Sequence, residues 1–289
     1  MQFLNTLSTT QQTTRTEYSP ASASGTLALT TNANRFRNNI KIETPSINLS
    51  IPAIYGCDAD DDNIFNEDSD GENIACNFLS YMDVAAYLDW AGMRPMTELE
   101  YERLCRGTEP TMLYQLAWGN NTANGNLVLA AANYSNEFII NPSLSFGNMN
   151  YLGSNIGGPL RNGIFASASG GRVRSGASFY GVMELSGNLT EPVAHIGNVK
   201  GRYTRLRYFG FGDGNLSGSG NANVFYFPGM SNYSSGGECI NAAGTIIRGG
   251  SFLNNLADCS ISARFLATGF TTRNSIGGGR GIGYFLTAY

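Results

Sequence analysis

The chain has 289 residues with 18 basic and 22 acidic side chains, which gives a formal net charge of −4. This balance provides no broad basic face, so we expect no nucleic-acid partner. Charged residues make up 14% of the chain and glycine occupies 36 positions, which is typical of a compact globule rich in loops. No segment approaches the roughly 18–20 consecutive apolar residues of a membrane helix, so we expect no membrane insertion. The length fits one domain over residues 1–289 without a dividing linker.

The first fifty residues are rich in serine, threonine and asparagine. The pattern over residues 3–12 predicts a helix or a turn. Ile47, Leu49 and Ile51 are two positions apart, which predicts a strand over residues 47–54 that leads into a loop. Residues 1–7 lack the basic start and the apolar run of a secretion signal, so the sequence leaves localisation open.

Residues 57–76 form an acidic loop insertion. Within it, Asn66, Asp68, Asp70 and Gly71 match the first half of an EF-hand calcium loop, but the twelfth position of that pattern is Asn77 instead of Glu. Alternate spacing also relates Asp58, Asp60 and Asp62. The sequence therefore supports two interpretations: a bound hard cation such as calcium, or a solvated acidic loop.

Five cysteines occur without a CxxC pair or a His/Cys cluster, so structural zinc is not indicated. Cys57 and Cys76 bracket the acidic loop. They either form a disulfide in an oxidising compartment or remain two separate thiols.

Two helices are predicted after the acidic loop. Ser80 and Asp83 form a capping box ahead of residues 84–91, and Gly92 follows as a stop signal. Thr97 and Glu100 form a second capping box ahead of residues 101–104. Beyond this point helical periodicity is absent, and short apolar runs such as 179–183 and 245–247 predict short strands joined by irregular loops.

Several segments, taken in order, resemble one protein family. They are residues 90–102 with 105–107, then 117–120, 180–191 and 248–252. Together they resemble the formylglycine-generating enzyme, or sulfatase-modifying factor, family over about residues 75–289. The resemblance implies an α+β domain of C-type lectin-like fold with short strands, two main helices and much irregular structure. In that family a first strand precedes an element similar to residues 3–5, and we expect this chain to lack that strand.

The resemblance also implies where a catalytic copper site would lie. Oxidising family members bind copper through two cysteines five residues apart after the Arg-Gly-Gly-Ser motif, because soft thiolates select Cu(I). The corresponding positions in this chain are Asn254 and Cys259. Since an amide replaces one thiolate, we expect no bound copper, no catalytic residue and no enzymatic activity.

A structural calcium loop is a further implication of the resemblance. The ligand positions correspond to the side chains of Glu184 and Glu191 and to the backbone carbonyls of Gly187 and Leu189, and oxygen donors suit a hard ion. The alternative is that Glu184 or Glu191 pairs with an arginine, because arginine supplies most of the basic side chains.

In lectin-like relatives, the segment after the Arg-Gly-Gly-Ser motif and the final hairpin line the ligand surface. The resemblance assigns this role to Phe252, Asn254, Asn255, Asp258, Phe265, Arg273 and Asn274. Aromatic and short polar side chains provide contact area and adaptable hydrogen bonds. We therefore expect a carbohydrate or protein ligand at a cell surface.

Three functional interpretations follow. The favoured one is a non-catalytic extracellular or virion-surface binding module, a class that includes the variable proteins of diversity-generating retroelements. The alternative is a structural subunit of a surface appendage, virion or secretion assembly, because an open sheet edge invites strand addition by a second copy or another partner. The third is a copper-dependent cysteine oxidase that generates formylglycine.

Overall fold

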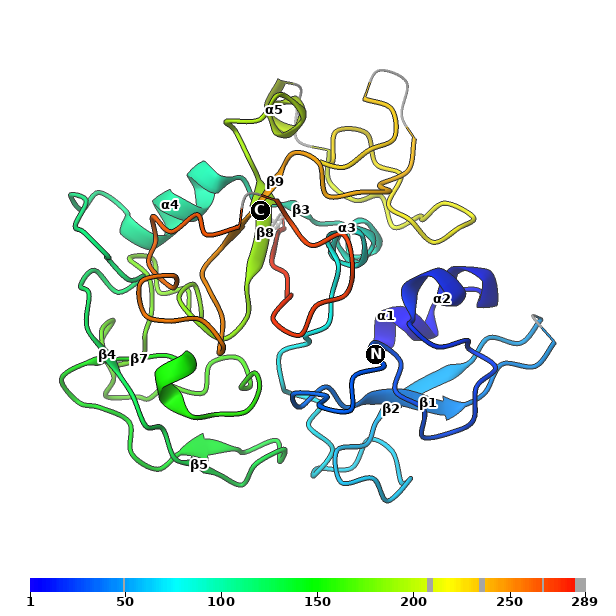
Figure 1. Ribbon diagram of the computed structural model, residues 1–289, viewed down its shortest axis with the longest axis horizontal. Coiled ribbons are helices and arrows are strands. Elements are labelled where there is room, and N and C mark those ends of the chain that lie inside the picture. Colours follow the sequence, from blue (N-terminus) through cyan, green and yellow to red (C-terminus); the bar gives the residue numbers. More distant parts are fainter. Residues whose placement is uncertain (49, 207–209, 234–236, 267, 284–289) are drawn as a thin grey trace, which may run out of the picture.

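The computed structural model describes residues 1–48, 50–206, 210–233, 237–266 and 268–283. Short helices and strands are joined by long loops, as expected for the predicted α+β class (Figure 1). An antiparallel pair, β8 (Glu191–Ala194) with β9 (Thr245–Arg248), lies near the middle of the molecule. Helices α3 (Tyr81–Trp90) and α4 (Glu98–Arg106) flank this pair in Figure 1.

Both predicted capping boxes form and begin the two main helices. Ser80 N donates to Asp83 Oδ2 at 3.0 Å, and Asp83 N donates to Ser80 Oγ at 3.2 Å. Thr97 and Glu100 make the equivalent pair of bonds ahead of α4. These bonds satisfy amides that have no partner within the helix. No helix among the described residues is both long and apolar enough to cross a membrane.

The N-terminal prediction is also confirmed, because the segment forms two short helices. They are α1 (Gln2–Asn5) and α2 (Thr9–Arg15), and α2 has its own capping box. A fifth helix, α5 (Val199–Leu206), has no counterpart among the predicted elements.

The strands of the described residues form five two-stranded sheets. Besides β8 with β9, the pairs are β1 (Ile40–Thr44) with β2 (Ile54–Cys57), β3 (Arg94–Pro95) with β10 (Gly281–Ile282), β4 (Ala123–Asn124) with β7 (Gly147–Asn148), and β5 (Leu129–Ala130) with β6 (Phe138–Ile139). The β4–β7 pair is parallel and the other four are antiparallel. A short 3-10 helix, Leu152–Ser154, follows β7.

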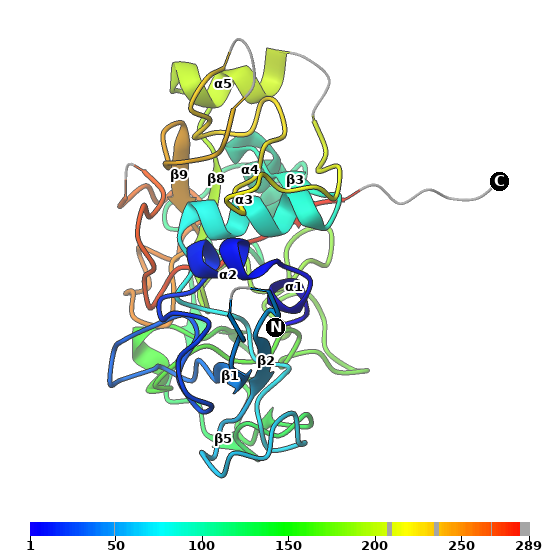
Figure 2. The ribbon, with the colours of Figure 1, turned by 90° about the vertical axis from the view of Figure 1, so that its right-hand side faces the viewer.

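Amide side chains attach the N-terminal helices to the chain around β2. Asn5 Nδ2 donates to Tyr55 O at 3.0 Å, and Asn5 Oδ1 accepts from Tyr55 N at 2.8 Å. Gln12 makes the same two-way contact with the backbone of Ala53. These bonds satisfy backbone groups at the outer edge of the β1–β2 pair. Phe3 packs against the ring of Trp90, so α1 lies beside α3 (Figure 2).

The largest hydrophobic cluster joins α4 to the central strands and to the chain around Trp118. Trp118 lies directly against the backbone of Gly147: a Cβ atom at Gly147 would approach the indole Cε2 to 2.0 Å. Three further clusters lie beneath the N-terminal helices, around α3 and under the loops near Leu160. The core is therefore distributed among loops that only short strands connect.

Two predicted strands are wrong. Ile47 and Ile51 are paired across a tight turn, and their side chains are exposed, so alternation there reflects the turn and not a buried face. The strand begins later, at Ile54, and Leu49 lies outside the described residues. Residues 179–183 also form a turn, in which Gly181 N donates to Ser178 O, whereas residues 245–247 do belong to a strand, β9.

Of the two interpretations of Cys57 and Cys76, the structure has the one with two separate thiols. Cys57 and Cys76 are both free in the structure, although they belong to the same apolar cluster. Burial raises the pKa of the Cys57 thiol to about 12.

Candidate functional site

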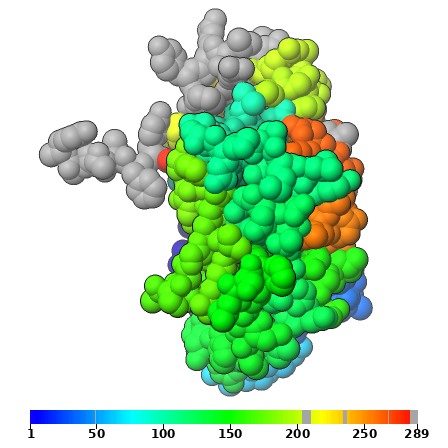
Figure 3. Space-filling view, turned by 90° about the vertical axis from the view of Figure 1, so that its left-hand side faces the viewer, coloured from blue at the N-terminus to red at the C-terminus, as the bar shows by residue number. Residues whose placement is uncertain are grey.

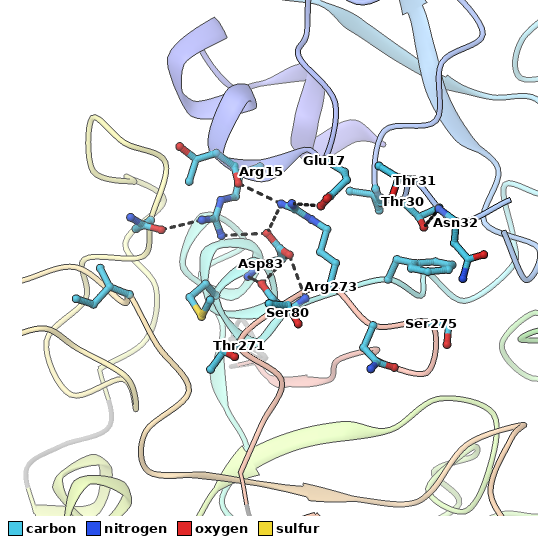
Figure 4. Close-up of a pocket in the computed structure, with 18 residues that line it drawn as sticks. Arg15, Glu17, Thr30, Thr31, Asn32, Ser80, Asp83, Thr271, Arg273 and Ser275 are labelled. Atoms are coloured by element: carbon cyan, nitrogen blue, oxygen red, sulfur yellow. Dashed lines mark hydrogen bonds and ion pairs between the residues drawn. The ribbon is translucent and has the colours of Figure 1, made fainter. Parts of the chain in front are cut away.

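A cavity of about 720 Å³ lies where three segments that are distant in the sequence meet. These segments are parts of residues 14–32, the chain at the start of α3, and residues 271–275, and Asn221 and Ile240 complete the lining (Figure 4). The volume falls within the range of about 300–1,000 Å³ that small-molecule sites occupy. This cavity is the candidate ligand site.

Two arginines share one carboxylate in a wall of the cavity. Arg15 Nη1 lies 3.1 Å from Asp83 Oδ1, and Arg273 Nη2 lies 3.0 Å from the same oxygen. The other oxygen of Asp83 is used by the capping box of α3. Arg273 Nη1 also lies 3.3 Å from Glu17 Oε2 (Figure 4). Burial lowers the pKa of Arg15, and the nearby Asp83 charge opposes that effect.

The rest of the polar lining is uncharged. Thr31, Thr271 and Thr272 are exposed at the cavity, and a hydroxyl group can both donate and accept hydrogen bonds. Asn32 adds an exposed amide. Phe78 also lines the cavity, but its ring is almost entirely buried and offers no open face for stacking.

Asn77 connects residues 36–38, which lie outside the cavity lining, to Ser275, which belongs to it. It is completely buried, and its Nδ2 donates to Phe36 O at 3.1 Å and to Ser275 O at 3.2 Å. In the opposite direction, Asn38 Nδ2 donates to both the backbone and the side-chain oxygen of Asn77. One side chain therefore fastens residues 36–38 to the segment that carries Arg273.

Only two of the predicted ligand-binding residues, Arg273 and Asn274, line this cavity. Phe252 is 1% exposed and packs against Phe36 with ring centroids 5.7 Å apart, so its prediction as a surface contact is corrected to a core position. A buried aromatic ring and an exposed one cannot be separated by composition alone.

The other predicted ligand-binding residues lie outside the cavity lining. Asn255 is exposed, while its Oδ1 accepts from Asp258 N at 3.0 Å within a local turn. Asp258 and Phe265 are half-buried. These three residues stay predicted contacts of a separate surface.

The positions that correspond to the copper ligands of oxidising family members hold an amide and a buried thiol. Asn254 Oδ1 accepts a hydrogen bond from Ser251 Oγ at 2.6 Å. Cys259 has no exposed surface, and burial raises the pKa of its thiol to about 12. Two-coordinate thiolate ligation of Cu(I) needs a second sulfur, and an amide stands at the other position.

The acidic loop brings together a different set of carboxylates from the one predicted. Side-chain oxygens of Asp58, Asp60 and Asp70 lie within 4.8 Å of one another. Asp68 is exposed and Asn66 Oδ1 accepts from Cys57 N, so of the Asn66, Asp68 and Asp70 prediction only Asp70 belongs to the cluster. The loop folds residues 58–60 back onto Asp70, whose carboxylate accepts from Ala59 N at 3.1 Å, and this contact brings Asp58 and Asp60 to Asp70.

The Asp58–Asp60–Asp70 cluster can hold a cation such as calcium. Asp58 is completely buried, and its Oδ1 has no hydrogen-bond partner among the described residues. Lys41 Nζ lies 2.8 Å from the other oxygen of Asp58 and also pairs with Asp61. Arg35 contributes a second positive charge at Asp61, 2.6 Å away. The two basic groups offset only part of the negative charge of this loop, which leaves an excess that a cation can balance.

The second predicted calcium loop contains an arginine contact. Arg280 Nε donates to Glu191 Oε1 at 2.8 Å, and Arg280 Nη2 donates to Met183 O at 3.0 Å. Glu184 Oε1 accepts from Gly163 N, and burial raises the pKa of both Glu184 and Glu191. Glu191 is therefore paired with an arginine, as the second of the two interpretations predicted.

The remaining residues of that predicted set lie nearby in the fold. Gly187 has a positive φ of 81°, and Leu189 is buried. With Glu184, Glu191 and Arg280, Leu189 lines a second cavity of about 780 Å³. No group of three potential acidic, cysteine or histidine ligands among the described residues includes Glu184 or Glu191. A metal at this loop stays a prediction.

Sequence reasoning did not identify Arg15, Glu17 or Asp83 as site residues. Asp83 was recognised only as a capping residue, because its second oxygen has no signature in the sequence. Arg15 and Arg273 are 258 positions apart, and only the fold brings them to the same carboxylate. The sequence around Arg15 contains no pattern that predicts a contact with a residue so distant in the chain.

The fold and these sites define an α+β domain with short strands, few helices and long irregular loops. The sulfatase-modifying factor enzyme 1-like domain matches residues 56–278, so the chain belongs to the formylglycine-generating enzyme, or sulfatase-modifying factor, family. A comparison with curated proteins gives no match.

Proposed function

We propose that this chain is a non-catalytic binding module of its family, which holds a ligand without transforming it. The observation that carries the proposal is the pair of residues at the copper positions. Asn254 is engaged with Ser251 through its side-chain oxygen, and Cys259 is a fully buried thiol with a raised pKa. A single buried sulfur with an amide in place of the second thiolate is a poor Cu(I) site, because soft thiolates select Cu(I).

The cavity beside Arg273 supports a binding role. Its volume of about 720 Å³ and its many hydroxyl and amide groups suit a small polar ligand. The residues that line it come from both ends of the chain, and Arg273 and Asn274 belong to the segment that the family resemblance assigns to ligand contact.

We also propose that calcium binds the Asp58–Asp60–Asp70 cluster in a structural role. The unpartnered buried oxygen of Asp58 and the excess of negative charge in the loop support this assignment. An ion there would link the two ends of a loop that contains no strand.

Copper titration with a cysteine-containing peptide tests the central proposal. The purified protein and its Cys259→Ala variant are titrated with Cu(I) against a chromogenic competitor, and aldehyde formation in the peptide is followed by mass spectrometry. We expect the two proteins to behave alike and to form no aldehyde. Stoichiometric Cu(I) uptake that depends on Cys259, together with aldehyde formation, would overturn the proposal.

A second candidate function is that of a subunit in a larger assembly. Large apolar side chains are exposed along one long segment, among them Leu113, Tyr114, Ile140 and Leu144. Figure 3 shows that this segment, in green, covers much of one face of the molecule. Exposed apolar side chains of this size are typical of contact surfaces when they lie together.

Sedimentation velocity over a range of concentrations tests the assembly candidate. Oligomers that dissociate in a Leu113→Ser, Leu144→Ser double variant would support it. A monomer at every concentration for both proteins would remove self-assembly from consideration and leave the binding role.

A further inference from the structure

We infer that the cavity at Arg273 binds a saccharide that carries a carboxylate, with the Arg273 guanidinium as the receptor for the charge. This inference rests on the proposed binding function and specifies its ligand class. It depends on the charge balance of the cavity wall, on the position of Glu17 and on the chemistry of the remaining lining.

The buried part of the charge network has an excess of positive charge. Arg15 and Arg273 face the single buried carboxylate of Asp83. Glu238 acts on Arg15 only at longer range, because its carboxylate accepts from Ser219 and Asn221. Two guanidinium groups on one carboxylate leave one positive charge to be balanced, and an unbalanced charge in a partly buried site is costly.

Glu17 supplies that balance from the solvent side. Its Oε2 lies 3.3 Å from Arg273 Nη1, and its side chain is 40% exposed. Because the Glu17 side chain is exposed, water screens this pair, and ion pairs open to solvent contribute only about 0–1 kcal/mol. A carboxylate on a ligand can therefore replace the Glu17 carboxylate at Arg273 at little cost. Glu17 thus occupies the position that the charged group of the ligand would take.

Other anionic ligands fit the lining less well. A phosphate group is usually held by several cationic groups or by free helix amides. Of the two arginines in the lining, Arg15 is already engaged with Asp83 and Asn221, which leaves Arg273 as the cationic group nearest the solvent. At the start of α3, Tyr81 N donates to Phe270 O and Asp83 N donates to Ser80 Oγ. A nucleotide base would need an open aromatic face, and Phe78 is buried.

The neutral lining indicates the rest of the ligand. The exposed hydroxyls of Thr31, Thr271 and Thr272, and the amide of Asn32, can each donate and accept. A ligand with many hydroxyl groups complements such a surface, because every hydroxyl also needs both a donor and an acceptor. Together with one receptor for a single charge, this composition matches a uronic or sialic acid unit within a short glycan.

Matched acidic and neutral sugars test the inference. Binding of digalacturonic acid, glucuronic acid and N-acetylneuraminic acid is measured by calorimetry or saturation-transfer NMR, with the methyl ester of each sugar as the neutral control. We expect at least one acid to bind about tenfold more tightly than its ester and to weaken with added salt. Inorganic phosphate is included as a simple anion. Equal binding of acid and ester, phosphate binding as tight as that of the acids, or no binding at millimolar concentration would each overturn the inference.

Three variants locate the binding site. Glu17→Gln removes the internal competitor at an exposed position and should tighten acid binding several-fold. Arg273→Gln should weaken it about tenfold, the effect expected for loss of a charged partner. Arg264→Gln changes an arginine of the same C-terminal region outside the cavity lining and should leave affinity unchanged. If Arg273→Gln does not fold, the Glu17→Gln result decides, and unchanged affinity there contradicts the inference.

The outcome separates this inference from the proposed function. Binding of a neutral glycan or of a protein, unaffected by Glu17→Gln, would leave a binding module whose site or ligand class differs from the one inferred. Copper-dependent oxidation of a peptide would remove the proposed function itself.

Discussion

Arg280 Nε donates a hydrogen bond to Glu191 Oε1 at 2.8 Å, and this contact joins the last described strand region to β8. The same guanidinium donates to the carbonyl of Met183. A side chain of the protein thus supplies positive charge inside the loop for which the family resemblance implied calcium. This positive charge is the guanidinium group of Arg280.

Replacing Arg280 should therefore destabilise the fold. Arg280→Met leaves the buried carboxylate of Glu191 without its partner, and we expect a loss of about 2–3 kcal/mol in the free energy of unfolding. Urea denaturation measures this loss. The double variant Arg280→Met, Glu191→Gln removes both charges and should recover much of the stability. A single variant as stable as the parent would show that the pair contributes nothing. Calcium that stabilises the single variant and not the parent would show that the loop can accept a metal once the arginine is gone.

The acidic loop offers a comparison between the sequence pattern and the structural cluster. Asp60→Asn changes a member of the Asp58–Asp60–Asp70 cluster, whereas Asp68→Asn changes a residue that only the EF-hand pattern selects. We expect Asp60→Asn to weaken calcium or terbium binding about tenfold and Asp68→Asn to have little effect, because affinity depends on the charges that contact the ion. Terbium luminescence gives the affinities directly.

Calcium should also raise the melting temperature of the parent protein. An ion at a hundredfold excess over its Kd stabilises the folded state by about 2.7 kcal/mol. Chelation that leaves the melting temperature unchanged, or an Asp68→Asn variant as weak as Asp60→Asn, would contradict the cluster assignment.

The raised pKa of Glu184 predicts a dependence of stability on pH. Burial raises the pKa of Glu184 in the folded state above its ordinary value, so the folded protein holds this proton more tightly than the unfolded chain does. The resulting stability is fully present below the unfolded pKa of about 4.3 and is lost as the pH rises through the folded pKa. Glu184→Gln should remove this loss, so we expect the variant to be more stable than the parent near pH 7.

Denaturation of Glu184→Gln and the parent at several pH values checks the sign. The two stabilities should converge at acidic pH, where Glu184 is protonated in both the folded and the unfolded state. A difference that does not change with pH would indicate that the substitution acts through packing or through the bond from Gly163.

The contact between Gly147 and Trp118 predicts that the stability of the protein depends strongly on the size of the side chain at position 147. Gly147→Ala places a methyl group 2.0 Å from indole Cε2, so the ring or the β4–β7 pair must move, and we expect a loss of about 1–3 kcal/mol. Gly157→Ala is the matched control, because no atom lies within 4 Å of the added carbon. Thermal unfolding of both variants, followed by tryptophan fluorescence, gives the comparison. Equal melting temperatures would mean that Trp118 has room to move.

The parts of the fold with local signals were predictable from the sequence. The capping boxes at Ser80 and Thr97 place helix starts correctly, because the bonds join residues three positions apart. The predicted strand over residues 47–54 was wrong because the spacing of Ile47 and Ile51 is compatible with a turn as well as with a strand.

The site depended on contacts that span the chain. The Arg15–Asp83–Arg273 network joins residues from the N-terminal helices, α3 and the C-terminal segment, and no spacing in the sequence marks it. Likewise, Phe252 and Arg273 looked equally suitable as contact residues, and only packing against Phe36 distinguishes the buried ring from the accessible cation.

Asn77 has a consequence for how a ligand would enter the cavity. Its side chain and carbonyl hold residues 36–38 and Ser275 together through four hydrogen bonds, all at completely or partly buried positions. Because the bond to Ser275 holds a residue of the cavity lining, we expect this part of the wall to keep its position when a ligand binds. Association should then follow a single exponential whose rate rises linearly with ligand concentration, without the plateau that a slow opening step imposes.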